Sequence, residues 1–118
     1  MRRDFELIRR ILLHIEKQES DSACVMPEDI TGFAPAETAR HMRLLESAGL
    51  IDADISQTIG SSWVKATAIT WKGYDFLDHI RKDSTWNAVK QTLAKKGIDM
   101  SIDSIMAAGD LFIRQLLS

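Results

Sequence analysis

The chain has 118 residues, of which 45 % are hydrophobic and 27 % are charged, and its formal net charge is −2. This length suits one compact domain, and this composition excludes a long disordered tail. The slight negative charge argues against general attraction to nucleic acid, because that attraction depends on cations that neutralise phosphates. A local basic patch would overrule this argument.

The sequence also indicates a cellular compartment. Cys24 is the single cysteine, so no internal disulfide can form, which fits a reducing interior. No apolar run approaches the roughly 20 residues that span a bilayer. A signal peptide needs an uninterrupted apolar segment, and the charged residues between Asp4 and Arg10 prevent one here. We therefore predict a cytoplasmic protein with no membrane partner.

The first predicted element is an amphipathic helix from about Asp4 to Lys17, with Asp4 as its N-cap. Its apolar residues recur at spacings of three and four and are Phe5, Ile8, Ile11, Leu12 and Ile15. The short apolar segment Ala23–Met26 is interrupted by Pro27, and it predicts a short edge strand.

A helix followed at once by a hairpin is the most informative pattern in the chain. Residues Ala36–Ala48 predict an amphipathic helix, and Gly49 is placed to end it in the left-handed conformation. Leu50–Ser56 alternates apolar and polar residues and predicts a half-buried strand. After a turn, Trp63–Ile69 is rich in β-branched and aromatic residues and predicts the returning strand.

Three helices are predicted after the hairpin. The first runs from Thr70, its N-cap, to about Lys82, and the second begins at a cap on Ser84 or Thr85. Ser101 caps the last helix. The apolar stripe of that helix is a candidate dimer face and consists of Ile102, Ile105, Met106, Gly109, Phe112, Ile113 and Leu116.

The order of helix, hairpin and capped helix is typical of a winged helix-turn-helix. We therefore predict a single α+β domain with a winged helix-turn-helix-like core at about residues 3–82. A two-helix extension follows at about residues 84–117. We expect Trp71 and Trp86 to anchor this extension on the core.

Four blocks of sequence carry a family resemblance. They are M-R-R-D-F-E-L-I-R-R-I-L-L-H-I-E, A-R-H-M-R-L-L-E-S-A-G-L-I, T-W-K-G-Y-D-F-L-D-H-I-R and T-W-N. In this order they resemble a bacterial and phage-associated family of unknown function, DUF family 2513, over most of the chain up to about Lys96. The resemblance implies a small bacterial protein, sometimes encoded by a prophage, and it implies no activity.

A looser resemblance is to winged-helix transcriptional regulators. It consists of a leucine-rich helix ending in A-G-L-I and of the T-x-K-G pattern at Thr70, Lys72 and Gly73. Two departures stand out. The segment available for the preceding helix, Pro27–Thr31, is about one turn long, and the hairpin tip, Gln57–Ser62, has no Lys or Arg.

The DNA-contact candidates are Arg40, Arg43 and Ser47, which share the polar side of the predicted helix at 36–48. Arginine can bind guanine or phosphate from this position. The alternative is a solvated helix face on which Glu37 and Glu46 balance the charges of the two arginines.

Other chemistry has little support in the sequence. The three histidines, with His41 at a helix margin and His14 and His79 on polar faces, lack zinc-site spacing with Cys24. Phosphate-loop, dinucleotide and nucleophile-elbow motifs are absent. We therefore expect no enzyme, no metal, no cofactor and no small-molecule ligand.

Two functions remain open from the sequence. The first is a non-enzymatic regulatory protein of winged-helix type that binds double-stranded DNA through the helix at 36–48. The second is a protein–protein interaction module that keeps the fold without DNA contact. Its partner is a second copy of the chain, as a homodimer, or another protein.

Overall fold

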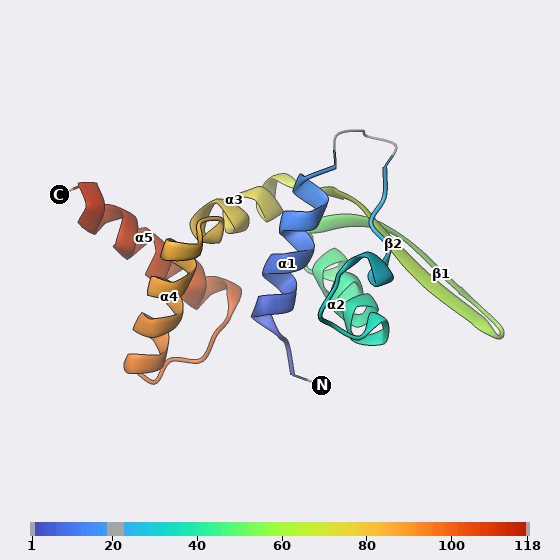
Figure 1. Cartoon of the computed structure of the whole chain (residues 1–118), viewed down its shortest axis with the longest axis horizontal. Helices are drawn as coiled ribbons and strands as arrows, with labels where there is room; N and C mark the ends of the chain where they lie inside the picture. The colour runs from blue at the N-terminus through green and yellow to red at the C-terminus, as the bar shows by residue number, and fades with distance from the viewer. Residues whose placement is uncertain (1, 19–22, 118) are drawn as a thin grey trace. The chain divides into compact units, whose positions relative to one another are not determined.

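The computed structural model describes residues 2–18 and 23–117 and has an α+β fold (Figure 1). Five α-helices, one short 3₁₀ helix and one antiparallel hairpin make up these residues. The elements are α1 (Phe5–Glu16), η1 (Pro27–Asp29), α2 (Pro35–Ser47), β1 (Ile51–Thr58), β2 (Ser61–Ile69), α3 (Trp71–Ile80), α4 (Asp83–Lys95) and α5 (Ile102–Leu117). They form two compact units, residues 1–74 (unit 1) and 75–118 (unit 2).

Helix α1 begins where the sequence predicts. The Asp4 carboxylate accepts hydrogen bonds from the backbone N–H groups of Glu6 and Leu7, at 3.0 and 3.2 Å, which confirms the N-cap. One face of α1 is buried and packs on α2 and β2 in unit 1. The buried residues are Phe5, Leu7, Ile8, Ile11, Leu12 and Ile15.

Helix α2 begins at Pro35 and ends at Ser47, within one residue of the predicted bounds. Proline suits the first position of a helix, because its missing N–H has no partner there in any case. Gly49 has φ = 78°, so it adopts the left-handed conformation predicted for the residue that ends the helix.

The hairpin of β1 and β2 projects as an arm from unit 1 (Figure 1). Ile59 and Gly60 form its two-residue tip, and Gly60 has φ = 86°. The register shifts between Asp52 and Ala53, where the ladder is irregular. The strand predicted at Ala23–Met26 is reduced to a single bridge between Val25 and Ala66. Pro27 opens η1 directly afterwards and prevents a longer strand.

The start of α3 lies close to the end of α2. The Thr70 hydroxyl accepts from the Gly73 N–H at 3.1 Å, which confirms the predicted cap, and it donates to the Gly49 carbonyl at 2.6 Å. A Cβ on Gly73 would overlap the Leu50 carbonyl oxygen and lie 2.7 Å from Cγ2 of Ile69. Only glycine therefore permits this close approach.

Helices α4 and α5 pack against each other in unit 2. Ser101 caps α5 as predicted, because its hydroxyl accepts from the Ser104 N–H at 3.0 Å. The predicted cap of α4 on Ser84 or Thr85 is wrong. Helix α4 already begins at Asp83, after an extended Lys82 that makes no side-chain cap bond.

The two tryptophans expected to anchor the extension differ in exposure. The Trp71 side chain is 85 % exposed, whereas Trp86 is buried. The inner face of α3 is formed by Gly73, Phe76 and Leu77 with Ile80, and all four are buried. At 100° per residue, Trp71 points away from the middle of that face. None of the helices in the described part of the chain has the length and hydropathy that a bilayer crossing requires.

Candidate functional site

The three DNA-contact candidates divide into two exposed residues and one that contacts the hairpin. Arg40 and Ser47 are exposed on α2. Arg43 is half-buried, and its Nη2 donates to the Ser62 hydroxyl near the tip of the hairpin at 3.3 Å. Its Nε is buried without a hydrogen-bond partner among the described residues. Arg43 therefore already connects α2 to β2 within unit 1.

The charges around these arginines balance. Glu37 and Glu46 are exposed on α2, three residues from Arg40 and from Arg43 respectively, and Asp52 and Asp54 are exposed on β1. Residues 1–74 contain 9 Lys and Arg and 11 Asp and Glu, so unit 1 has a formal charge of 9 − 11 = −2. Phosphate binding draws on a local excess of positive charge, and the elements around Arg40 do not supply one.

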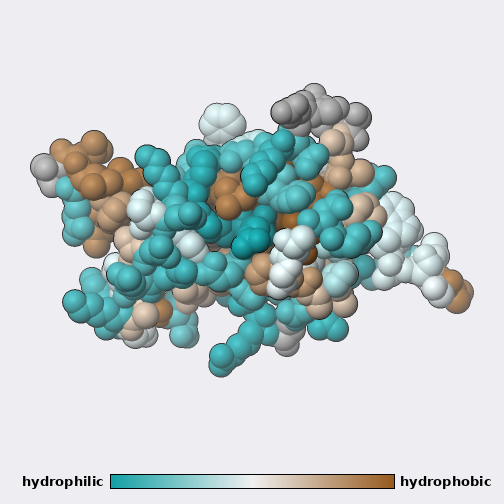
Figure 2. Space-filling view, in the orientation of Figure 1, coloured by the Kyte–Doolittle hydropathy of each residue, from teal (hydrophilic) through white to brown (hydrophobic). Residues whose placement is uncertain are grey.

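The tip of the hairpin is uncharged and partly apolar. Ile59 is fully exposed there, and Trp63 on β2 is 42 % exposed. The Lys65 ammonium lies 5.5 Å from the centre of the Trp63 ring, which is a cation–π distance. Hydrophobic side chains are visible at the far end of the hairpin (Figure 2). The tip therefore offers apolar contact rather than charge.

His41 is fully buried, although the sequence places it at a helix margin. Its Nδ1 donates to the Glu37 carbonyl at 2.8 Å, and its Nε2 accepts from the Asp4 N–H at 2.9 Å. These two bonds require the tautomer with hydrogen on Nδ1. His41 thus joins α2 to the start of α1. Nothing in the local sequence indicates this role, because the partner lies 37 residues away.

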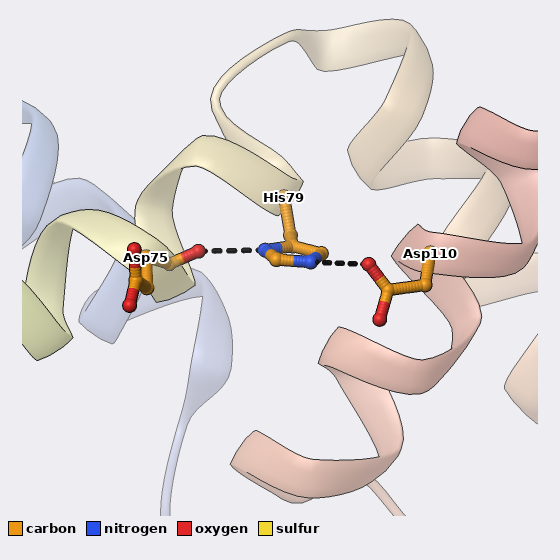
Figure 3. Close-up of polar contacts among 3 residues, drawn as sticks. All are labelled: Asp75, His79 and Asp110. Carbon is orange, nitrogen blue, oxygen red and sulfur yellow. Dashed lines mark hydrogen bonds and ion pairs between the residues drawn. The ribbon is translucent and has the colours of Figure 1, made fainter.

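His79 forms a second polar link, within unit 2 (Figure 3). Its Nδ1 donates to the Asp75 carbonyl at 2.6 Å, and its Nε2 donates to Oδ1 of Asp110 at 2.7 Å. Partial burial lowers the pKa of His79. The hydrogen bonds to Asp75 and Asp110, together with the two carboxylate charges, outweigh that effect, so the pKa lies above its ordinary value of 6.5.

The candidate dimer face on α5 is only partly accessible. Ile105 and Gly109 are buried, and a Cβ on Gly109 would lie 3.1 Å from Cβ of His79 in the same unit. Ile102, Met106 and Phe112 are partly exposed. Ile113 and Leu116 are 39 % and 68 % exposed, and Leu117 beyond them is 82 % exposed. The end of α5 is accordingly hydrophobic on the surface (Figure 2).

Helices α4 and α5 also border an open, mainly apolar pocket of about 190 Å³. Its lining residues are Thr92, Leu93, Lys96, Ile98, Ser104, Ala107, Ala108 and Leu111. Within the described ranges, no three His, Cys, Asp or Glu side chains gather in a way that would hold a metal ion.

Comparison with known proteins gives one family. Residues 2–99 match the model of a family described as hypothetical protein (DUF2513). A protein of Haemophilus influenzae, described as an uncharacterized protein, is 37 % identical over 118 residues, which are 100 % of both chains. No solved structure matches the chain. These findings support the resemblance predicted from the four sequence blocks.

Proposed function

The chain belongs to the DUF2513 family, whose description states no activity, and from its own surface we propose a non-enzymatic protein–protein interaction module of winged-helix type. In this proposal α2 is the recognition-type helix, the β1–β2 hairpin is the wing, and α3 follows the wing. Binding partners dock on the surface that α2 and the hairpin share in unit 1.

The observation that carries the proposal is the balance of charge on this surface. Glu37 lies three residues before Arg40 and Glu46 lies three residues after Arg43, so each arginine has a carboxylate one helical turn away. Arg43 is directed to Ser62 of the hairpin instead of outward. Exposed apolar side chains are available beside these charges. They are Leu44 on α2, Ile55 on β1 and Ile59 at the tip, which are 39 %, 40 % and 107 % exposed. Mixed polar and apolar surface suits a protein partner better than a phosphate backbone.

A photo-crosslinking amino acid at Leu44 tests this proposal in the bacterium that encodes the chain. We expect a reproducible crosslink to one protein species, which weakens when Ile59→Asp is added at the hairpin tip. The matched control places the same crosslinker at Asn87, which is exposed on α4 in unit 2. Equal crosslinking from both positions, or none from Leu44, would contradict an interaction surface on α2 and the hairpin.

Binding of double-stranded DNA is the second candidate function. It is favoured by Arg40 and Ser47, which are exposed on α2, where a major groove could accept them. Anisotropy titration with mixed-sequence duplex DNA at low and moderate salt separates the two functions. If the chain is an interaction module, we expect no saturable binding of the duplex, even at low salt.

The opposite result has a clear signature. A DNA-binding protein would lose affinity as salt rises. The logarithm of its association constant would fall with the logarithm of the salt concentration, with a slope of about 0.9 per phosphate contact. It would also lose affinity in the variant Arg40→Glu, whereas Lys95→Glu on α4 would leave affinity nearly unchanged. Such a result would replace the interaction module with the DNA-binding function.

A further inference from the structure

The outer edge of β1 has no strand beside it among the residues that the structure describes. Ala66 on β2 donates its N–H to Val25 at 2.9 Å and accepts from the Val25 N–H at 2.8 Å, so its backbone groups face away from β1. Facing residue pairs in an antiparallel ladder are of two kinds that alternate. In one kind the two residues hydrogen-bond each other, and in the next kind their backbone N–H and C=O groups point away from each other. Ala53, the partner of Ala66, therefore turns outward, as do Ile55 and Gln57. No other described strand pairs with β1.

We propose that this edge, residues 53–57 and called the β1 edge below, binds an extended peptide segment in which basic and apolar residues alternate. The peptide adds to the hairpin as a further strand. Main-chain hydrogen bonds supply affinity in this mode of binding, and alternate side chains supply specificity. This inference rests on the proposed function and specifies the chemistry of the partner.

One face of the hairpin calls for basic residues in the partner. Asp52 and Asp54 are exposed there; Asp54 belongs to the β1 edge, and Asp52 directly precedes it. Lys65, across the ladder from Asp54, lies on the side away from that edge, and its ammonium is placed over the Trp63 ring. The face thus has a net negative charge at the edge, and opposite charges side by side on neighbouring strands stabilise the pairing.

The other face calls for apolar residues. Ile55 is 40 % exposed, and Ala53 is half-buried on the same side of β1. Successive side chains of a strand point to opposite faces, so an added strand would place every second side chain on the face of Ile55, and one of them directly beside it. An apolar side chain there would remove the exposed part of Ile55 from water.

A second copy of β1 fits this edge poorly. In an antiparallel pair of β1 strands joined through their outward-turned residues, Asp52 and Asp54 of both copies would stand on one face. Four carboxylates would then share that face, and like charges on neighbouring strands are destabilising. The same aspartates therefore disfavour self-pairing and favour a basic strand.

NMR titration of the full chain with synthetic peptides tests the inference. The probe is a capped nine-residue peptide with lysine and valine alternating, and the matched control replaces each lysine with glutamate. We expect the lysine peptide to shift the amide resonances of Ala53, Ile55 and Gln57 and to slow their hydrogen exchange. The glutamate peptide should bind about tenfold more weakly. Equal binding of the two peptides, or shifts confined to other elements, would overturn the inference.

Two variants examine the geometry and the charge separately. Ile55→Pro removes one outward-turned N–H without breaking the ladder to β2, because proline is tolerated at a strand edge. It should weaken binding of the lysine peptide about tenfold, whereas Ile55→Ala keeps the N–H and should weaken this binding much less.

The double variant Asp52→Lys with Asp54→Lys should reverse the preference between the two peptides. Asp99→Lys with Asp103→Lys in unit 2 is the charge control and should leave the preference unchanged.

These outcomes separate this inference from the proposed function. If the lysine peptide leaves the β1 edge unchanged while the crosslink from Leu44 persists, the β1 edge is not the docking site and the interaction module stands. If the crosslink is also absent, both fail. Binding that Ile55→Pro does not weaken would exclude strand addition, provided the resonances of α1 and α2 show the variant is folded.

Discussion

At the scale of single residues, His41 shows how one buried side chain orders the start of the chain. Its ring accepts from the Asp4 N–H and donates to the Glu37 carbonyl, and Asp4 in turn caps α1. A buried donor that loses its acceptor costs about 1–3 kcal/mol, and a cavity adds to that cost. The position of the α1 N-terminus thus depends on a residue of α2.

We predict that His41→Ala lowers the free energy of unfolding by about 2–4 kcal/mol, because it combines an unpaired N–H with a cavity. Urea unfolding followed by circular dichroism measures this change. His14→Ala, at a half-buried position of α1, is the control and should cost about 1 kcal/mol or less. Equal losses in both variants would show that the hydrogen bonds of His41 contribute nothing specific.

At the scale of elements, the contact between α3 and α5 depends on the protonation of His79. Both partners of the ring are acceptors, the Asp75 carbonyl and the Asp110 carboxylate, so the two hydrogen bonds form together only when the ring is protonated. Gly109 permits this approach, since a larger residue would press against His79. The sequence predicts α3 and α5 separately but does not indicate that these two residues meet.

The pKa of His79 sets a pH dependence for this contact. Because the pKa of the folded protein lies above the ordinary 6.5, the stabilisation is complete below about pH 6.5 and is lost as pH rises through the folded value. We predict that Asp110→Asn destabilises the chain more at about pH 6 than at about pH 8.5. Asp103→Asn, also exposed on α5, should show no such difference.

An NMR titration of the His79 ring measures its pKa directly. A value below 6.5 in the wild-type protein, or no fall in the pKa on Asp110→Asn, would contradict this assignment.

At the scale of the whole molecule, the exposed end of α5 predicts weak self-association. Ile113, Leu116 and Leu117 are exposed, but Ile105 and Gly109 are buried within unit 2. The exposed large apolar side chains of α5 all lie in the seven residues from 111 to 117, whereas a standard interface takes roughly 800 Å² from each partner. The dimer face inferred from the sequence is therefore shorter than its stripe of seven residues suggests.

Sedimentation at increasing protein concentration tests this prediction. We expect the average mass to rise only at high concentration, and Leu116→Glu should suppress the rise, because a charge placed in an apolar contact is costly to desolvate. Lys95→Glu at the exposed end of α4 is the control and should leave the rise intact. A strictly constant mass in the wild-type protein would exclude α5 as a dimer face.

The sequence determined the elements, because the signals that form them are local. The apolar period of α1, the caps at Asp4, Thr70 and Ser101, and the left-handed Gly49 each depend on a few neighbouring residues. Where those signals competed, the prediction failed. Ser84 and Thr85 are both good capping residues, and they predicted that α4 begins after them. The helix begins at Asp83 instead, directly after the extended backbone of Lys82.

The tertiary structure alone decided which polar side chains meet. His41 and Asp4 are 37 residues apart, His79 and Asp110 are 31 apart, and Arg43 and Ser62 are 19 apart. Periodicity assigns a residue to a face but does not identify the residue opposite it. For Arg43 the fold decides how far the side chain is available to a partner. The sequence predicts that it points outward, but it contacts Ser62 of the hairpin.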